Sequence, residues 1–307
     1  MRLTDDSRLR GLVAAPHTPF TADGSLALDL VDRQVEHLVD TGVSGVFVAG
    51  STGEGLSLTG DERRALLERW VEAARGTPLR VIAHVGALAI GESVALAAHA
   101  EATGADAVAS LAPSYMRPAT VGALINWLAP VAAACARTPF YYYDIPALTG
   151  VEFATDEVLE TGGARIPNLA GVKLTRHDLS LCLASLRLGD GEFDVLFGHD
   201  EELLGGLVMG SRGFVGSSYN FAAPAYRRVI DAFEAGDLET ARRTLAWCVE
   251  LLRTLARHDY LPAAKVTMGF LGVEVGPARS PLDNLDAART AALRADLESI
   301  DFFATVA

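Results

Sequence analysis

Ala170-Gly-Val-Lys-Leu174 is the stretch that decides the fold, because in it a short apolar run ends on a single charged side chain, Lys173. Two further apolar runs lie upstream and also end on polar groups. They are Phe140-Tyr-Tyr-Tyr143, which ends on a phenol, and Val46-Phe-Val-Ala-Gly50, which is followed by two hydroxyl side chains. Near-continuous apolar runs are typical of parallel strands buried on both faces. Polar groups at the ends of three such strands predict one shared site.

The same kind of run recurs along most of the chain and alternates with segments of helical spacing. The expected strands are Gly11–Ala15, Gly45–Ala49, Arg80–Val85, Ala107–Leu111, Phe140–Tyr143, Leu169–Lys173, Asp194–Phe197 and Gly213–Gly216. Helix-like segments between them include Leu28–Asp40, Asp61–Ala74, Glu92–Thr103 and Glu201–Met209. Repeated βα units over roughly 220 residues predict an α/β fold, a (β/α)8 TIM barrel. The alternative is a doubly wound open sheet. Such a sheet is expected to carry a G-x-G-x-x-G motif after its first strand, and no such motif is present there.

From about Ala223 onward the pattern becomes purely helical. The segments with helical spacing of apolar residues are Ala225–Ala235, Leu238–His258 and Asn284–Ser299. No composition break marks a linker. We therefore expect a single domain over residues 1–307, with the barrel at 8–222 and a C-terminal helical extension at 223–307.

The charge of the chain bounds its partners. It has 307 residues, a net charge of −13 and a pI of about 5.0, and half of its residues are hydrophobic. Acidic and basic residues are interspersed along the chain. Nucleic acids and anionic membranes are bound by clustered Lys and Arg, so we expect neither as a partner.

Three observations favour a cytoplasmic protein. The first residues, Met1 to Arg8, include acidic side chains and lack the apolar run of a signal peptide. The uncharged stretch from Pro118 to Ala136 is interrupted by Gly122, Asn126 and Pro130, and it fits a buried barrel helix better than a membrane span. Three cysteines cannot all pair within one chain and show no Cys-x-x-Cys spacing, so reduced thiols are expected at Cys135, Cys182 and Cys248.

Lys173 is the candidate nucleophile, because groups at the carboxyl ends of barrel strands gather where such barrels do their chemistry. The amine that attacks a carbonyl carbon must be neutral, whereas an ordinary lysine side chain has a pKa of about 10.4. An apolar pocket or a nearby cation favours the neutral amine. The run Leu169–Val172 could supply the apolar part. A solvated lysine at a strand end is the alternative.

Tyr143 is the candidate general acid/base. Alternation along a strand puts Tyr141 and Tyr143 on one face and Tyr142 on the other, so one orientation points Tyr143 into the barrel. A phenol there could shuttle a proton to a substrate hydroxyl. A purely structural tyrosine is the alternative.

Gly50-Ser-Thr-Gly-Glu54 is a turn bounded by glycines. Its backbone N–H groups, with the hydroxyls of Ser51 and Thr52, could hold a carboxylate. An ordinary turn that caps the next helix is the alternative. Taken with the lysine and the tyrosine, the hydroxyl pair suits imine chemistry on a 2-oxo acid.

Two further loops are polar enough to belong to a site. Gly198-His-Asp-Glu201 follows a strand and could hydrogen-bond a polyhydroxylated chain, with N-capping by Asp200 as the alternative. Gly216-Ser-Ser-Tyr-Asn220 follows the last expected strand, where a tight turn or a phosphate site is the alternative. The histidines are scattered, and neither H-E-x-x-H nor a Cys/His cluster at ligand spacing is present. No dedicated metal site is therefore expected.

With these motifs the chain resembles the pyruvate-dependent class I aldolases of the dihydrodipicolinate synthase and N-acetylneuraminate lyase superfamily, and within it the N-acetylneuraminate lyase branch. The resemblance runs from Arg10 to Pro281. It is carried by Gly50–Leu58, Ile82–Leu88, Phe140–Val151, Leu196–Glu201 and Val215–Asn220. It implies a lyase that cleaves a small-molecule substrate, the sialic acid N-acetylneuraminate, to N-acetylmannosamine and pyruvate. It also implies a covalent imine on the enzyme, no cofactor or metal, and a homotetramer.

The resemblance implies a role for each matching residue. Lys173 corresponds to the imine-forming lysine and Tyr143 to the catalytic tyrosine. Ser51 and Thr52 match the pair that binds the pyruvyl carboxylate. Tyr115 falls where many members place an accessory tyrosine, near the hydroxyl pair or a neighbouring subunit's site. The residues that match contacts with the sugar chain are Thr175, Gly198, Asp200, Glu201 and Ser217.

Two positions depart from parts of the superfamily. Dihydrodipicolinate synthases carry an arginine for the aldehyde's carboxylate five residues after the catalytic tyrosine, where this chain has Leu148. An uncharged sugar aldehyde is therefore favoured. Asp144 stands where asparagine is common and is expected to bring a negative charge near Tyr143. Two alternatives stay open: an aldolase or dehydratase for another 2-oxo-3-deoxy sugar acid, and a catalytically silent pyruvate-binding protein.

Overall fold

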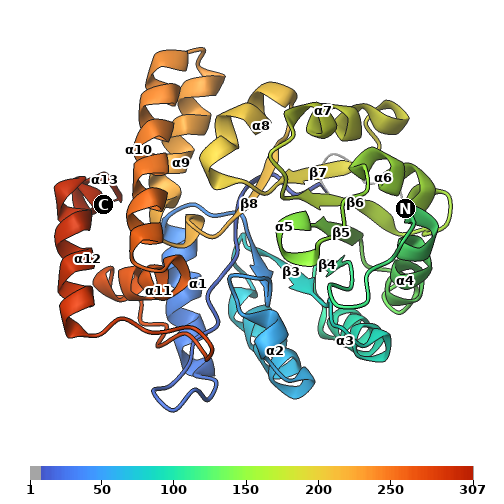
Figure 1. Ribbon diagram of the computed structural model, residues 1–307, viewed down its shortest axis with the longest axis horizontal. Helices are drawn as coiled ribbons and strands as arrows, with labels where there is room; N and C mark the ends of the chain where they lie inside the picture. The colour runs from blue at the N-terminus through green and yellow to red at the C-terminus, as the bar shows by residue number, and fades with distance from the viewer. Residues whose placement is uncertain (1–7, 307) are drawn as a thin grey trace.

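The computed structural model describes residues 8–306 and forms a closed barrel of parallel strands surrounded by helices (Figure 1). The strands pair in chain order, and the last closes on the first, with Gly11 opposite Gly213 and Ala14 opposite Gly216. The predicted TIM barrel is therefore confirmed. The N-terminal residues used to argue against a signal peptide, up to residue 7, lie outside the part of the chain that the structure describes.

Each predicted apolar run coincides with a strand, and the two ends agree to within one residue. The strands are β1 (Gly11–Ala14), β2 (Gly45–Val48), β3 (Arg80–His84), β4 (Ala107–Leu111), β5 (Phe140–Asp144), β6 (Leu169–Leu174), β7 (Asp194–Phe197) and β8 (Gly213–Gly216). Their residues are buried almost throughout, because helices cover the outer face and side chains fill the inside.

Helices follow the strands around the barrel. They are η2 (Leu28–Leu30), α1 (Val31–Asp40), η3 (Gly55–Ser57), α2 (Gly60–Ala74), α3 (Ile90–Thr103), α4 (Val121–Ala133), α5 (Pro146–Thr149), α6 (Thr155–Gly163), α7 (Leu179–Arg187), η4 (Leu188–Asp190), η5 (Asp200–Glu202), α8 (Leu203–Met209) and α9 (Tyr219–Glu234). The uncharged stretch Pro118–Ala136 contains a helix, α4, as predicted. Between residues 8 and 306, no helix combines the length and the apolar character that a membrane crossing requires.

The barrel interior holds one of the two hydrophobic clusters. Tyr141 and Tyr143 point into it and pack with Phe47 and Leu196, whereas Tyr142 belongs to the outer layer beneath the helices. This is the alternation predicted for β5, with Tyr143 on the inner face.

The C-terminal helices form one side of the molecule, drawn in orange and red in Figure 1. They are α10 (Leu238–Arg257), α11 (Tyr260–Phe270), α12 (Ala287–Ser299) and α13 (Phe302–Val306), and α10 packs on both α9 and α11. Helix α9 begins at Tyr219, six residues before the predicted start. The extra residues form a first helical turn, which is separated from the rest of the helix by a kink at Ala222, two residues before Pro224. The predicted division at residue 222 falls inside α9, and the domain description stays a prediction.

Candidate active site

A cavity of about 580 Å³ opens at the carboxyl ends of the strands. All but one of the residues predicted for the site line it: Ser51, Thr52, Tyr143, Lys173, Thr175, Gly198, Asp200, Glu201 and Ser217. The exception is Tyr115, which is 80 % exposed on the segment between β4 and α4. The geometry thus brings together groups from five different loops and strand ends.

Lys173 lies near the end of β6 and is only 4 % exposed. Its Nζ is 4.1 Å from the ring centroid of Phe47 and 4.2 Å from that of Tyr143. Within residues 8–306 its amine makes no hydrogen bond and no ion pair, and the faces of two aromatic rings lie against it. An amine that is buried but unpaired is free to attack a carbonyl carbon.

Gly171 lets β6 approach β7 closely enough to hold Lys173 in place. A Cβ atom at Gly171 would lie 1.9 Å from the carbonyl oxygen of Asp194. Only glycine fits this close backbone approach. The Ala-Gly-Val-Lys stretch therefore supplies both the reactive amine and the space that the strand carrying it needs.

Tyr143 is directly opposite Lys173 in the β5–β6 pairing. Its hydroxyl is 3.4 Å from the Ser51 Oγ, so the phenol and the first hydroxyl of the turn share one corner of the cavity. His84 packs edge-to-face on the Tyr143 ring, with ring centroids 5.7 Å apart. Burial lowers the pKa of His84 to about 3, so this imidazole is neutral beside the phenol.

The turn that carries Ser51 and Thr52 has an unusual backbone. Ala49 and Glu54 on either side both have positive φ, 55° and 53°. Such conformations are costly for residues other than glycine and concentrate at functional sites. A Cβ atom at Gly55 would lie 1.8 Å from the Ala49 carbonyl oxygen, so the loop also needs glycine where it folds back on itself.

A buried ion pair fixes this turn to the C-terminal helices. Lys265 of α11 reaches Glu54 with an Nζ–Oε1 distance of 3.1 Å, and it also donates to the carbonyl oxygens of Thr18 and Pro277. The second oxygen of Glu54 accepts from the backbone N–H of Arg279 at 2.8 Å. Both charged side chains are almost fully buried. Sequence reasoning missed this support, because the partners lie more than two hundred residues apart.

Asp200 and Thr175 add two further polar side chains to the lining of the cavity. Asp200 accepts hydrogen bonds from the backbone N–H and the hydroxyl of Ser218, and burial raises the pKa of its carboxyl to about 6. The buried Thr175 Oγ1 has no hydrogen-bond partner within residues 8–306. An unpartnered hydroxyl in a cavity suits a polar ligand.

The C-terminal extension lines the mouth of the cavity, which the sequence analysis did not predict. Val249, Leu252, Arg253 and Ala256 contribute from α10, and Tyr260 from α11. The Tyr260 hydroxyl is 2.7 Å from the Ser217 Oγ. Helical spacing alone does not say which face of α10 meets the barrel, so no local signal could have found these residues.

The expected influence of Asp144 on Tyr143 is wrong. Asp144 lies on the outer face of β5 with Tyr142, because side chains two apart share a face. There it pairs with Arg176 through two hydrogen bonds of 2.6 and 3.1 Å and accepts a third from Thr155. Its charge is compensated on the far side of the strand.

At the rim of the cavity the structure assembles a cluster that sequence spacing did not reveal. Possible ligand atoms of His177, His199 and Glu201 lie within 4.8 Å of one another. The residues follow two different strands, β6 and β7, so no short motif joins them. Sequence spacing alone did not predict this cluster, and the expectation of no dedicated metal site stays a prediction.

Comparisons with known proteins agree with this architecture. Residues 8–300 match the Dihydrodipicolinate synthetase family. The chain is 40 % identical to N-acetylneuraminate lyase of Xenopus tropicalis over 302 residues, which cover 94 % of this chain and 98 % of that protein. It is also 40 % identical to the Homo sapiens N-acetylneuraminate lyase, over 96 % and 93 % of the two chains. The solved structure of Proteus mirabilis N-acetylneuraminate lyase superimposes with a TM-score of 0.93 at 37 % identity, covering 96 % of this chain and 99 % of the other.

Proposed function

The chain belongs to the Dihydrodipicolinate synthetase family, and from this premise we propose that it is a class I aldolase that cleaves N-acetylneuraminate to N-acetylmannosamine and pyruvate. The observation that carries the proposal is the buried, unpaired amine of Lys173, 4.2 Å from the Tyr143 ring in a cavity that also holds the hydroxyl pair. The relatives named above, at 40 % identity, support the choice of substrate.

The proposed reaction begins at Lys173. Its amine attacks the ketone carbon of the open-chain sugar acid, and loss of water gives a protonated imine. Ser51 and Thr52 hold the neighbouring carboxylate, which fixes the ketone above the amine. The 3.4 Å contact between Ser51 and Tyr143 puts the phenol next to the carboxylate end of the substrate.

In the loss of water the phenol of Tyr143 donates a proton to the departing hydroxyl group, and the resulting phenolate then accepts the proton of the hydroxyl on the carbon that becomes the aldehyde. The adjacent carbon–carbon bond breaks, and its electron pair moves into the protonated imine to give an enamine. N-Acetylmannosamine leaves, the enamine carbon takes up a proton, and hydrolysis of the imine releases pyruvate and restores Lys173. The protein amine supplies the electron sink, so we propose that the reaction requires no cofactor.

The far half of the cavity is the proposed site for the sugar chain. Thr175 offers its unpartnered hydroxyl, and Asp200 and Glu201 offer carboxylate oxygens that can accept from substrate hydroxyls. Gly198 leaves space, because a Cβ atom there would lie 2.2 Å from the Thr175 hydroxyl. Ser217 is oriented by Tyr260.

Leu148 supports an uncharged aldehyde partner over a carboxylate-bearing one. It is 59 % exposed in α5 and offers no hydrogen-bond donor. The alternative reaction, cleavage of a different 2-oxo-3-deoxy sugar acid, would use the same amine of Lys173 and the same phenol of Tyr143. Identification of the product distinguishes between the two substrates.

We also propose a homotetramer in the cytoplasm. The assembly rests on the resemblance to the family, and on exposed leucines around a second cavity of about 370 Å³: Leu56, Leu148 and Leu282. Burial of such side chains favours association. The compartment is supported by the three cysteines, which are buried thiols without a disulfide. Light scattering after size exclusion measures the assembly.

The test uses the unusual lysine content of the chain. Lys173 and Lys265 are its only lysines, so borohydride reduction in the presence of pyruvate can modify few amines. We expect a covalent adduct at Lys173 by peptide mass spectrometry, and release of pyruvate and N-acetylmannosamine by NMR. Lys173→Ala should show neither. Lys173→Arg, which keeps the charge but cannot form the imine, is the matched control.

Each result has a definite meaning. An adduct without cleavage of N-acetylneuraminate would move the substrate to another 2-oxo-3-deoxy acid. Absence of any adduct in folded wild type would favour the catalytically silent pyruvate-binding protein. Normal turnover by Lys173→Ala would refute the assignment of the nucleophile.

A further inference from the structure

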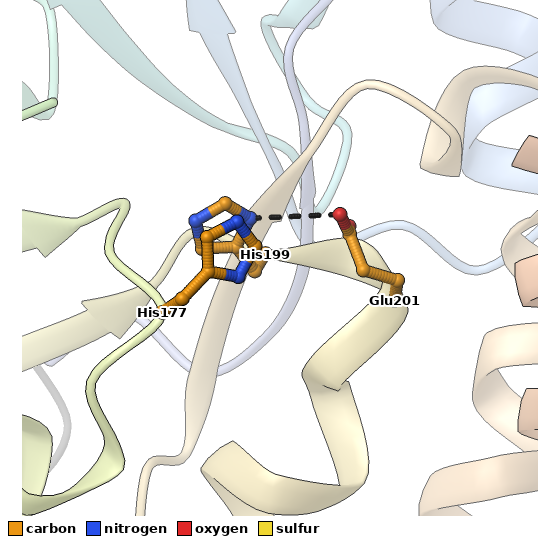
Figure 2. Close-up of side chains that lie close together, drawn as sticks. All are labelled: His177, His199 and Glu201. Carbon is orange, nitrogen blue, oxygen red and sulfur yellow. Dashed lines mark ion pairs between the residues drawn. The ribbon is translucent and has the colours of Figure 1, made fainter. Parts of the chain in front are cut away.

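The rim of the cavity carries two histidines whose rings lie face to face. His177 comes from the loop after β6 and His199 from the loop after β7, and their ring centroids are 3.8 Å apart with an angle of 25° between the planes. Figure 2 shows the side chain of Glu201 directed from η5 toward the ring of His199, with 3.8 Å between His199 Nδ1 and the Glu201 Oε1. Two imidazoles and a carboxylate thus meet at one point.

A second carboxylate orients the first of these rings. His177 Nδ1 lies 2.8 Å from the Glu202 Oε1, so the Nδ1–H of His177 donates to Glu202. In a neutral imidazole the other nitrogen then keeps its lone pair. A carboxylate behind a histidine is the arrangement by which proteins prepare the opposite nitrogen for a metal ion. Nothing in the proposed cleavage uses this contact.

The charges of the cluster also favour a cation. Glu201 and Glu202 bring two negative charges to a pair of stacked rings. A cation at the edges of the two rings, on the side that faces Glu201, would compensate these charges. Arg253 of α10 also lines this cavity and brings a positive charge to it. The chemistry of two nitrogen donors with one carboxylate suits Zn²⁺ and its neighbours in the first transition row, rather than Mg²⁺ or Ca²⁺, which prefer oxygen.

The geometry requires a modest closure. Ligand atoms around an ion with bonds of about 2.0–2.2 Å lie about 3–3.5 Å apart, compared with separations of up to 4.8 Å in this cluster. The side chains of His177 and Glu201 are 65 % and 42 % exposed, so both can rotate inward. Three protein ligands leave a fourth position open to water or to a sugar hydroxyl.

We propose that His177, His199 and Glu201 form a binding site for a divalent transition-metal ion, with Zn²⁺ as the best-matched ion, at the mouth of the cavity. Occupancy withdraws Glu201 from the sugar chain and narrows the entrance. It therefore inhibits cleavage while the imine between pyruvate and Lys173, at the inner end of the cavity, still forms. The inhibition rests on the proposed function, whereas the metal site itself does not.

Binding is measured without catalysis, by calorimetric titration of chelator-treated full-length protein with zinc chloride and by the visible spectrum of the Co²⁺ complex. We expect one ion per chain, and loss of that binding in His177→Gln. Glu202→Gln should weaken it by about 10–100-fold, because the second carboxylate only orients a ligand. His99→Gln is the matched control, since His99 also contacts a carboxylate, Glu68, at 2.8 Å but, among the residues that the structure describes, belongs to no cluster of three possible ligands. It should bind zinc as wild type does.

The functional arm follows pyruvate release with and without zinc. Cleavage by wild type should fall with zinc and recover with chelator, and His177→Gln should cleave normally without being inhibited. Borohydride trapping of pyruvate should be equal with and without zinc. Absence of binding, or equal binding by wild type and His177→Gln, overturns the site. Binding that leaves cleavage unchanged overturns the inhibition, and a protein that binds zinc but cleaves nothing refutes the proposed function alone.

Discussion

The ion pair between Glu54 and Lys265 offers the sharpest test of how the C-terminal helices support the site. Lys265 is 3 % exposed and its ammonium makes three hydrogen bonds, to the carboxylate of Glu54 and to two carbonyl oxygens. Burial lowers the pKa of Lys265 to about 8, so at pH 7 the group is still charged. Glu54 belongs to the strained turn that carries the hydroxyl pair.

Lys265→Met removes the ammonium and keeps most of the volume of the side chain. The carboxylate of Glu54 then stays buried with the backbone N–H of Arg279 as its remaining donor. Breaking a buried pair by removing one partner costs about 3–5 kcal/mol. The orphaned carbonyl oxygens of Thr18 and Pro277 add to that cost, at about 1–3 kcal/mol each when they stay dry. We expect a loss of at least about 3 kcal/mol in the free energy of unfolding.

Urea unfolding at pH 7, followed by tryptophan fluorescence, measures this loss. The double variant Glu54→Gln/Lys265→Met removes both charges and should recover about 0.5–3 kcal/mol of the loss. In the folded fraction of Lys265→Met, the pyruvate concentration for half-maximal trapping should rise. The reason is that the turn with Ser51 and Thr52 is no longer held by the ion pair between Lys265 and Glu54. A loss below about 1 kcal/mol, or a double variant less stable than expected from the sum of the two single changes, would refute the reasoning.

Three further predictions address the site and its surroundings. Tyr143→Phe should lower kcat for cleavage by about 10²–10⁴-fold while pyruvate trapping persists, and a wild-type rate would remove the phenol from the mechanism. Gly171→Ala, whose added Cβ meets the Asp194 carbonyl oxygen at 1.9 Å, should cost about 1–3 kcal/mol in urea unfolding and reduce trapping as well, whereas unchanged stability would contradict the close approach. Burial lowers the pKa of His17 to about 3, below its ordinary value of 6.5, so its contribution to stability is present above pH 6.5 and is lost as the pH falls. Between pH 7 and pH 4, wild type should therefore lose about 3 kcal/mol of unfolding free energy relative to His17→Leu. A difference between the two proteins that does not change with pH would show that this imidazole is not held neutral.

Much of the fold followed from local patterns. Apolar runs bounded by turns marked every barrel strand, because a parallel strand that is buried on both faces places nearly all of its side chains in an apolar environment. The alternation in Tyr141–Tyr143 fixed which tyrosine enters the barrel once one face was chosen. The residues expected to surround the substrate also met, because every strand of such a barrel delivers its carboxyl end to the same rim.

Features that depend on contacts between distant segments escaped prediction. The pairing of Asp144 was missed because its partner, Arg176, follows a different strand. The contribution of Arg253 and Tyr260 to the cavity depends on how α10 and α11 dock, which their own helical spacing leaves open. The cluster of His177, His199 and Glu201 at the rim arises from two loops that the barrel brings side by side.

The sequence by itself determined the order and identity of the strands, the lysine and the tyrosine near the ends of two of them, and the turn with two hydroxyls, since each is encoded by residues adjacent along the chain. Only the tertiary structure decided that Lys265 anchors Glu54, that His177 stacks on His199, and that the last helices complete the mouth of the cavity. The physical reason is that periodicity and turn chemistry act over a few residues. Ion pairs, ring contacts and cavity walls depend instead on how helices and strands that are distant in the sequence pack against one another.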